Sequence, residues 1–439
     1  MLVCIKPIFK MSRNFSFLLL LLLLLSNLKT NASTYFVSPV GQDQFAGTIT
    51  SPFLTIQKAQ TIVIPGDTVL IRGGNYILNE TQIAAYDGIK LYVNLMNKSG
   101  SPNKYIHYLA YLNETPVFDF SQIKVPNFRV HAFEILGSWL HFKGIQVIGV
   151  QVTITNVNTQ SICFSNDGGS NNIFEQLSMH DGQGIGFFLT KGSNNLILNC
   201  DAYRNNDITS KAGGGRNGGN VDGFGNHPQK GSVNNIYRGC RAWLNSDDGF
   251  DCINAQEVTV FENCWAFYNG YAEGFISRGD GNGFKVGGYG AGPVRNLPNP
   301  IPRNKTINCI AVMNKANGFY ANHHLGGNDW IGNTAYKNGV NFNMTNRKSG
   351  TEDSVLIDVA GYGHLLERNL SYLPKINGND FTHLDLNESK FLNNSSSENL
   401  MPSDFLNLDL SILIAPRDKE GNLLRDGFLA LKKKINTVQ

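Results

Sequence analysis

Carboxylate side chains and a repeated Gly-Phe pair occur together in three short segments of the chain. The segments read VDGF at 221–224, SDDGFDC at 246–252 and GNGFKVGG at 281–288. Alignment on the Gly-Phe pair gives two columns: Asp222, Asp248 and Asn282 before the glycine, and Gly225, Asp251 and Lys285 after the phenylalanine, with Asp247 directly before Asp248. If the segments are neighbouring strands about 4.8 Å apart, four carboxylates and one lysine meet on a small patch.

The predicted patch has the donor set of a Ca²⁺ site. Asp222, Asp247, Asp248 and Asp251 supply only oxygen ligands, and no His or Cys falls in register with them. Carboxylates at this spacing repel one another unless they are protonated or bridged by a cation. Oxygen ligands in a flexible arrangement favour Ca²⁺ over zinc or copper. The competing interpretation is a set of turn-forming aspartates, because Asp-Gly pairs are common in turns.

Lys285 is the candidate base of the patch. A bound divalent cation disfavours the ammonium form of a neighbouring lysine, which makes the amine available to accept a proton. A base beside a cation that binds carboxylates suits removal of the C5 proton of a uronic acid, followed by β-elimination of the 4-linked sugar. The alternative role for Lys285 is a plain salt bridge that neutralises the aspartates.

A repeat of about 24 residues supports the stacking. The first repeated column consists mostly of small residues: Gln176, Cys200, Cys240, Cys264, Cys309 and Asn333. Five residues after each lies a member of a second column, which is asparagine in all copies but the first: Asp181, Asn205, Asn245, Asn269, Asn314 and Asn338. The intervals are 24, 40, 24, 45 and 24 residues. The longer intervals contain Gly-, Pro- and Asn-rich stretches at 207–221 and 287–304, which are typical of loops inserted at one edge of a solenoid.

This period predicts an all-β fold, a parallel β-helix with three strands per coil. A leucine-rich repeat has a similar period, but its Leu-x-x-Leu-x-Leu signature is absent. Stacked asparagines can hydrogen-bond through their side-chain amides. We expect the β-helix domain over 33–365, with an N-terminal cap over about 33–76. Residues 366–439 form a C-terminal extended segment that continues or covers the helix.

The N-terminus has the pattern of a secretory signal peptide. Basic residues precede an unbroken leucine run from Leu18 to Leu25, which is too short to span a bilayer. We therefore expect residues 1–32 to be removed and the protein to be secreted, although an uncleaved anchor is the alternative. Removal would leave 33 basic and 34 acidic side chains. Attraction for an acidic ligand must then come from a local patch or a bound cation.

Seven cysteines in a secreted chain are compatible with disulfides. Because Cys200, Cys240, Cys264 and Cys309 occupy one inward-facing column, we expect buried thiols there instead. Asn-x-Ser/Thr sequons leave glycosylation open; several of them begin at Asn79, Asn97, Asn113, Asn304, Asn343, Asn369 and Asn387. A capped solenoid of this kind is expected to be a monomer.

The Asp/Lys segments resemble the pectate lyases of polysaccharide lyase family 9. The resemblance extends to the opening YFVSPVGQD…SPFLTIQKA…PGDTVLIRGGNY, similar to that family's N-terminal cap, and to GHLLERNLSY at 363–372, similar to its late coils. It implies a right-handed parallel β-helix in which Asp222, Asp247, Asp248 and Asp251 bind one Ca²⁺ and Lys285 is the Brønsted base. The implied substrate is an acidic polysaccharide, pectate (polygalacturonate), with no nucleic acid or membrane partner.

Three other functions stay open at this point. A β-helix polygalacturonan hydrolase also uses clustered aspartates, but the Gly-His-Gly pattern that accompanies Arg-x-Lys in such enzymes is not found. A lyase acting on another uronate polymer would share the chemistry. A non-catalytic, Ca²⁺-stabilised glycan-binding β-helix would bind polysaccharide without cleaving it.

Side chains on or near the inserted loops are candidates for binding uronate carboxylates. They are Arg216, His227, Arg278 and Arg295. Loop arginines are common on any surface, so each could equally be a solvated charge. His323 and His324 lie outside the columns and are expected to be structural.

Overall fold

The computed structural model describes residues 32–155, 157–210, 217–288, 297–348 and 357–432. The expected signal peptide and two of the candidate arginines, Arg216 and Arg295, lie outside these residues. None of the helices in the described ranges has the length and apolar composition needed to cross a bilayer.

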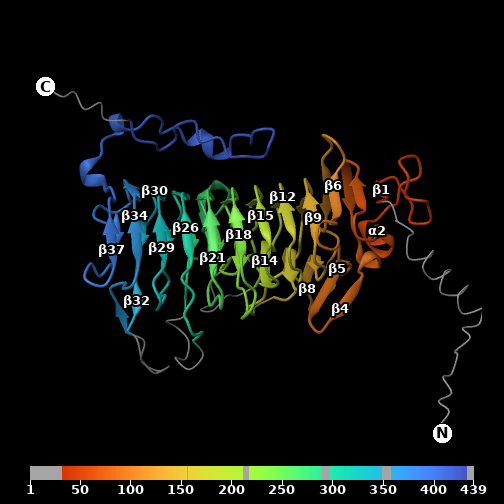
Figure 1. Cartoon of the computed structure of the whole chain (residues 1–439), viewed down its shortest axis with the longest axis horizontal. Coiled ribbons are helices and arrows are strands. Elements are labelled where there is room, and N and C mark those ends of the chain that lie inside the picture. The colour runs from red at the N-terminus through yellow and green to blue at the C-terminus, as the bar shows by residue number, and fades with distance from the viewer. Residues whose placement is uncertain (1–31, 156, 211–216, 289–296, 349–356, 433–439) are drawn as a thin grey trace, which may run out of the picture.

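Three long sheets run along the molecule, and successive strands of the chain fall in successive sheets (Figure 1). The first sheet has 12 strands. In spatial order they are β1 (Thr34–Val37), β2 (Thr68–Ile71), β6 (Ile106–Ala110), β9 (Leu140–Lys143), β12 (Ile173–Glu175), β15 (Leu196–Leu198), β18 (Asn235–Arg238), β21 (Thr259–Glu262), β26 (Lys305–Ile307), β29 (Asp329–Ile331), β34 (Leu365–Glu367) and β37 (Lys390–Leu392).

The second sheet has 10 strands. They are β3 (Gly74–Ile77), β7 (Pro116–Asp119), β10 (Gln146–Ile148), β13 (Ser178–His180), β16 (Asp201–Tyr203), β19 (Arg241–Trp243), β22 (Trp265–Phe267), β27 (Ile310–Val312), β30 (Thr334–Tyr336) and β35 (Leu370–Tyr372).

The third sheet has 11 strands, of which only the β4–β5 pair is antiparallel. They are β4 (Ala85–Asp87), β5 (Lys90–Met96), β8 (Arg129–Ile135), β11 (Ile162–Asp167), β14 (Ile185–Lys191), β17 (Phe224–Asn226), β20 (Phe250–Asp251), β25 (Phe284–Lys285), β28 (Asn317–Tyr320), β31 (Val340–Asn343) and β36 (Phe381–Thr382). One strand from each sheet makes a coil, and the predicted parallel β-helix is confirmed.

Short elements complete the described chain. Two hairpins leave the coils, β23 (Tyr271–Ala272) with β24 (Ile276–Ser277) and β32 (Asn346–Arg347) with β33 (Asp358–Val359). The helices are α2 (Ile56–Ile62) and the 3₁₀ turns η1 (Glu80–Gln82), η2 (Glu273–Phe275), η5 (Ser397–Asn399), η6 (Pro402–Asp404) and η7 (Leu410–Ile414).

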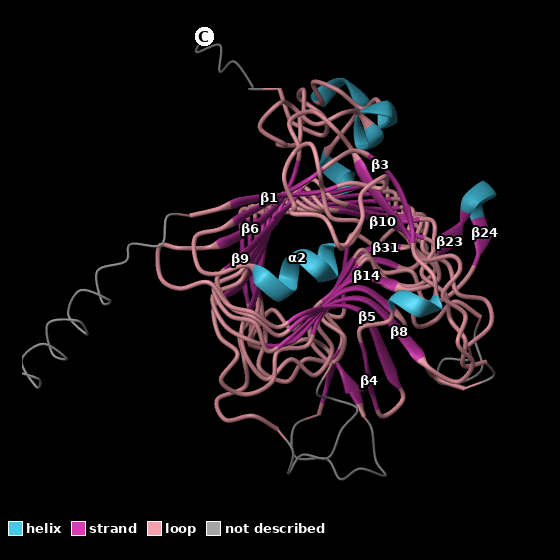
Figure 2. Cartoon of the chain, turned by 90° about the vertical axis from the view of Figure 1, so that its right-hand side faces the viewer, coloured by secondary structure: helices cyan, strands magenta, loops and turns pink. Residues whose placement is uncertain are grey.

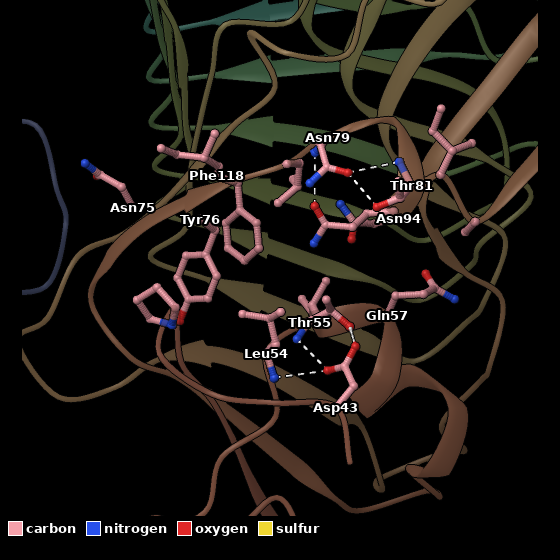
Figure 3. Close-up of a pocket in the computed structure, with 17 residues that line it drawn as sticks. Asp43, Leu54, Thr55, Gln57, Asn75, Tyr76, Asn79, Thr81, Asn94 and Phe118 are labelled. Carbon is pink, nitrogen blue, oxygen red and sulfur yellow. Dashed lines mark hydrogen bonds between the residues drawn. The ribbon is translucent and has the colours of Figure 1, made fainter. Parts of the chain in front are cut away.

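The N-terminal end of the helix is closed by α2, which lies across the opening of the coils (Figure 2). The Thr55 side chain caps α2 by accepting a hydrogen bond from Lys58 N. Asp43 accepts hydrogen bonds from Leu54 N, Thr55 N and Thr55 Oγ1 (Figure 3). These contacts cover the end of the apolar core, which would otherwise meet water.

Both predicted columns exist inside the coils. The asparagine column is a buried ladder in which each amide hydrogen-bonds the next; for example, Asn269 Nδ2 donates to Asn314 Oδ1 at 3.0 Å. The cysteine column is also buried, and all cysteines in the described residues are free thiols, as expected.

The predicted columns are wrong by one residue at their first coil. Ser178 pairs with Asp201, so Leu177 and not Gln176 lies beside Cys200. Likewise Gly182, not Asp181, occupies the level of Asn205 and donates its N–H to Asn205 Oδ1 at 3.3 Å. The first interval is therefore one residue shorter than predicted.

The coils continue to β37, and the chain then folds back along them and covers the second sheet (Figure 1). Apolar side chains of this return segment, among them Phe405, Leu413 and Phe428, pack on Trp265 and Tyr336. Two of the sequons begin at buried asparagines, Asn304 and Asn369, each 1% exposed, and these cannot carry glycans in the folded protein.

Candidate active site

The Gly-Phe pairs place the predicted patch on the third sheet. Phe224, Phe250 and Phe284 are in register on β17, β20 and β25, and so are Gly225, Asp251 and Lys285. The alignment made from the sequence is therefore confirmed as a set of neighbouring strands.

Steric demands inside the coil explain why the pair repeats. The phenylalanine rings point inward and stack, with centroids 4.8 Å apart for Phe224–Phe250 and 4.7 Å for Phe250–Phe284. A Cβ on Gly249 would lie 2.7 Å from the Gly283 carbonyl oxygen and 2.8 Å from Asn269 Nδ2. Glycine is needed because the backbone there packs directly against the next coil and the asparagine ladder.

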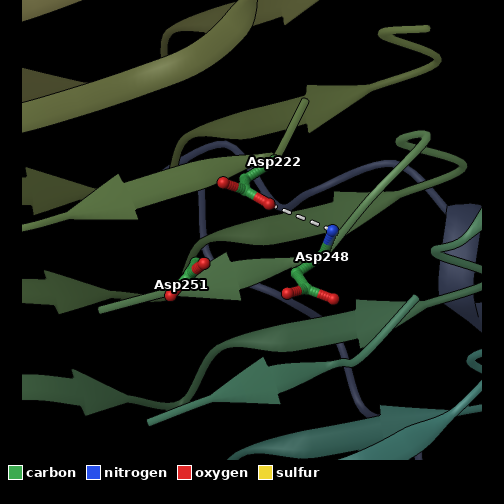
Figure 4. Close-up of side chains that lie close together, drawn as sticks. All are labelled: Asp222, Asp248 and Asp251. Carbon is green, nitrogen blue, oxygen red and sulfur yellow. Dashed lines mark hydrogen bonds between the residues drawn. The ribbon is translucent and has the colours of Figure 1, made fainter. Parts of the chain in front are cut away.

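Three buried carboxylates converge at this turn. Asp222, Asp248 and Asp251 each offer an oxygen atom within 4.8 Å of the others (Figure 4). Asp222 accepts a hydrogen bond from Asp248 N at 3.1 Å. Asp248, which is fully buried, accepts two from Asn282, at 2.6 Å from N and 2.8 Å from Nδ2. These bonds fix the orientation of the carboxylates.

Asp247 lies beside this triad, not within it. Its Oδ1 accepts a hydrogen bond from Asp280 N at 2.6 Å, and its side chain is buried. Its negative charge still acts on Asp222 and on Lys285. Of the four predicted ligands, the structure therefore brings three together and places the fourth next to them.

Lys285 reaches into the cluster from the next strand. Its Nζ is 3.1 Å from Asp248 Oδ2 and 3.1 Å from Asp251 Oδ2, and its side chain is 12% exposed. Burial opposes the positive charge, but the surrounding aspartates outweigh it and raise the pKa of Lys285 well above its usual value. The carboxylates thus hold Lys285 as an ammonium ion, the salt-bridged arrangement that the sequence left open.

The surroundings disfavour the charged form of the clustered carboxylates. Burial, and then the charges of neighbouring aspartates, raise the pKa values of Asp222 and Asp247 well above their usual range. Asp248 Oδ2 accepts no hydrogen bond, although Lys285 is near. Buried carboxylates that repel one another and supply only oxygen donors fit a hard divalent cation such as Ca²⁺.

The candidate substrate-binding residues have different positions. His227 follows β17 at the edge of the site, where its ring lies 4.9 Å from that of Phe188. Burial lowers the pKa of His227, and the charges of Asp251 and Lys285 act on it in opposite directions. Arg278 lines a separate cavity of about 350 Å³, and it hydrogen-bonds the carbonyl groups of Gly270 and Ser277. His227 therefore lies at the edge of the aspartate site, and Arg278 lines the separate cavity.

The Gly-Phe alignment extends further than the three segments used above. Gly186-Phe187 and Gly318-Phe319 continue it by one coil on each side. These pairs place Phe188 and Tyr320 in the same outward column as Asp251 and Lys285. Searching the sequence for every Gly-Phe pair would have found both flanking aromatics.

The fold and the similarity to known lyases together indicate a polysaccharide lyase built on a right-handed parallel β-helix. The chain belongs to the Pel9A-like right-handed β-helix family, because the model of that family matches residues 35–359. The predicted resemblance is thereby confirmed.

Several relatives are pectate lyases. Pectate lyase L of Dickeya chrysanthemi is 32% identical over 417 residues, which cover 91% of this chain and 84% of that protein. Pectate lyase PEL9 of Emericella nidulans is 27% identical and is covered to 92% by an alignment over 91% of this chain.

Two solved structures match over nearly the whole chain. A rhamnogalacturonan lyase is 42% identical with a TM-score of 0.85, covering 92% of this chain and 97% of the other. The pectate lyase Pel9A is 29% identical with a TM-score of 0.69, covering 94% and 92%.

Proposed function

We propose that this protein is a secreted, Ca²⁺-dependent pectate lyase that cleaves 1,4-linked α-D-galacturonan by β-elimination. Asp222, Asp247, Asp248 and Asp251 are the cation-binding side chains, and Lys285 is the Brønsted base. The observation that carries the proposal is the position of Lys285 Nζ, 3.1 Å from two carboxylates of a buried aspartate cluster. Pectate lyases among the relatives support the reaction type.

The chemistry assigned to the site is an elimination that needs no water. The C5–H bond of a galacturonate residue breaks and its electron pair forms the C4=C5 double bond. The C4–O4 bond to the next sugar breaks with its electron pair on O4, which takes up a proton from solvent. Lys285 accepts the C5 proton at Nζ. Ca²⁺, when bound, supplies positive charge for the substrate carboxylate and for the negative charge that develops as the proton leaves.

Lys285 must be neutral to act as a base. The aspartates hold it as an ammonium ion, but the same carboxylates cannot neutralise both a bound cation and the ammonium group. When these carboxylates are committed to a cation, they no longer raise the pKa of Lys285. Cation dependence and lysine basicity are thus coupled through the same four side chains.

A second substrate, rhamnogalacturonan, is favoured by a specific observation. A rhamnogalacturonan lyase shares more sequence with this chain, 42%, than the pectate lyase Pel9A does, 29%. The same proton would be removed from galacturonate, and only the sugar that leaves from C4 would differ. The site residues keep their roles for either polymer.

The test is the ultraviolet absorbance of the unsaturated uronide product, followed separately with polygalacturonate and with rhamnogalacturonan. We expect the band to grow with Ca²⁺ and to stop with excess chelator. Lys285→Ala should lower kcat by about 10²–10⁴-fold. Lys285→Arg should be equally inactive, because it keeps the charge but cannot give up its proton.

The controls separate the alternatives. Lys305→Ala, an exposed lysine of β26 on the first sheet, should leave activity unchanged. New reducing ends without the absorbance band would replace the elimination with hydrolysis. Polymer binding without bond cleavage would favour a glycan-binding β-helix. Secretion is checked by the N-terminal sequence of the exported protein, which we expect to begin near Ser33.

A further inference from the structure

A basic cavity lies on the same sheet as the aspartates, toward the N-terminal end of the helix. It has a volume of about 330 Å³ and lies over β5, β8, β11 and β14. The lining side chains that matter here are Lys90, Arg129, His131, Asp167, Phe188 and Lys191. The cap cavity of Figure 3 is larger, about 640 Å³, but its lining includes no basic residue.

Positive charge exceeds negative charge in this basic cavity. Lys90, Arg129 and Lys191 face a single lining carboxylate, Asp167, whose oxygens are 3.6 Å from Lys90 Nζ and 3.0 Å from Lys191 Nζ. The buried Glu134 lies nearby and pairs with His131 at 2.7 Å. Among the lining residues three cations therefore face one carboxylate; Glu134, and Asp87, which pairs with Lys90 between β4 and β5, lie outside the lining.

An aromatic side chain, Phe188, lies between the basic cavity and the candidate active site. Phe188 lines the cavity and its ring contacts that of His227, on which the charges of Asp251 and Lys285 act. Gly225 lies between Phe188 and Asp251 in the outward column. A Cβ there would lie 2.4 Å from the Phe188 ring, so the ring covers this glycine. An apolar ring next to a site for sugars is suited to stacking on a pyranose face.

The spacing of the cations suits a polymer with repeated carboxylates. Lys191 is on β14, two strands from Asp251 on β20, and Arg129 is on β8, four strands away. At about 4.8 Å per strand the displacements across the sheet are about 10 and 19 Å. They do not include the offset along the strands, since Lys191 follows Phe188 by three residues and Arg129 precedes Glu134 by five. A chain laid across the strands would therefore reach the cations while one of its residues occupied the aspartate site.

We propose that the basic cavity binds carboxylate groups of an acidic polysaccharide at positions remote from the bond that is cleaved. Phe188 stacks on the sugar between the cavity and the aspartates. This inference rests on the proposed function, and it adds Lys90, Arg129 and Lys191 as residues that determine affinity for long uronate chains. They contact the substrate but take no part in the proton transfer.

The test compares KM and kcat on whichever polymer the wild-type enzyme cleaves. The triple variant Lys90→Ala, Arg129→Ala, Lys191→Ala should raise KM by roughly two- to fivefold per cation and change kcat by less than about twofold. The matched control removes three cations from the first sheet, Lys143, Lys305 and Lys390, and should leave KM unchanged. Thermal melting checks that both variants are folded.

A further substitution distinguishes binding from a structural role. Asp167→Asn keeps the oxygen that accepts a hydrogen bond from Thr190 Oγ1 at 2.7 Å, but it removes the charge that competes for Lys90 and Lys191. We expect KM to fall about two- to threefold, because the freed lysines become available to the polymer. A purely structural role for Asp167 would give no gain in affinity.

The outcomes are separable from those of the proposed function. The basic cavity would be overturned as a binding site if KM were unchanged in the triple variant, or if kcat fell by as large a factor as KM rose. Either result would leave the lyase proposal in place. If wild type cleaves neither polymer, the lyase proposal fails. Retardation in a gel containing polygalacturonate then decides: loss of retardation in the triple variant but not in the control supports the site, and equal retardation overturns it.

Discussion

At the scale of single residues, the aspartate cluster keeps like charges buried together. Burial, and then the charges of Asp251, Asp247 and Asp248, raise the pKa of Asp222, which is 4% exposed. Such a side chain reduces the stability of the metal-free protein, and the proposed cation would relieve the repulsion. The proposed cation binding would account for the position of Asp222 better than packing does.

The substitution Asp222→Asn should stabilise the protein in chelator. It removes one repelling charge, which should raise the free energy of unfolding by about 1–3 kcal/mol. The amide oxygen can still accept the hydrogen bond from Asp248 N. The pKa of Asp222 is raised in the folded state, so its contribution to stability falls as the pH rises from about 3.8 through that raised pKa. The advantage of the variant should vanish in acid and grow toward neutral pH.

Urea unfolding at several pH values, with chelator and with Ca²⁺, provides the measurement. Ca²⁺ should stabilise wild type more than the variant, because the variant has lost a ligand charge. A variant that is less stable than wild type in chelator would contradict the assignment of Asp222 to a cation site.

The positions of site residues could be predicted from the sequence where a backbone repeat fixes them. Because the Gly-Phe pair fixes the inward ring and the close approach to the next coil, its alignment placed Asp251 beside Lys285 correctly. The hydrogen bonds of Asp248 could not be predicted: Asn282 was aligned with it, but the two bonds depend on the turn geometry. Lys90, Arg129 and Lys191 carry no shared motif, and only the fold brings them together.

At the scale of elements, the asparagine ladder supports the turn that carries the aspartates. Asn269 is fully buried, donates to the Ala242 carbonyl oxygen at 3.0 Å and accepts from Asn245 Nδ2 at 3.1 Å. Its Nδ2 also lies 2.8 Å from where a Cβ would be on Gly249, the residue after Asp248. Disturbing the ladder should therefore disturb the site.

We expect Asn269→Ala to lower the free energy of unfolding by about 2–4 kcal/mol, because it leaves buried donors and acceptors without partners. Activity should fall as well, through displaced aspartates. The exposed Asn75 of β3 supplies the control. Asn75→Ala should change the free energy of unfolding by no more than about 0.5 kcal/mol and should leave activity unchanged. Equal effects of the two substitutions, measured by urea unfolding and by the absorbance assay, would show that the ladder does not support the site.

The ladder also shows the limit of periodicity. Five of its six predicted positions were correct because asparagine recurs at the same level of the coils, even where a loop is inserted between them. The first was wrong because the coil between Ser178 and Asp201 is one residue shorter. A second amide ladder, through Asn172, Asn195 and Asn235, was not predicted, although its interval of 40 residues between Asn195 and Asn235 equals the one between Asn205 and Asn245 in the first ladder.

At the scale of the whole molecule, the return segment after β37 covers the second sheet, away from the third sheet with its aspartates (Figure 1). The sequence predicted a segment that continues or covers the helix. It could not predict the face, because the contacts join residues about two hundred positions apart. Asp201 on β16 binds Arg241 of β19 and Arg417 of the return segment, at 2.8 and 2.5 Å.

Asp201→Asn should loosen the return segment without changing the chemistry of the site. Burial opposes the charge of Asp201, but the hydrogen bond from Arg241 and the charge of Arg417 outweigh it and lower its pKa. The stability that it contributes is therefore present above about pH 3.8 and is lost as the pH falls through the lowered pKa. We expect the variant to lose about 3 kcal/mol at neutral pH, since two largely buried guanidinium groups lose their counter-charge.

The loss should shrink in acid, where wild type also loses the charge. Limited proteolysis should cut the variant first within the return segment, while kcat on the preferred polymer stays close to wild type. Glu420→Gln, an exposed acid on the same segment, is the matched control and should change neither stability nor proteolysis. If Asp201→Asn instead lowered kcat as strongly as it lowered stability, the second sheet would be coupled to the active site, and the return segment would be more than a cover for the helix.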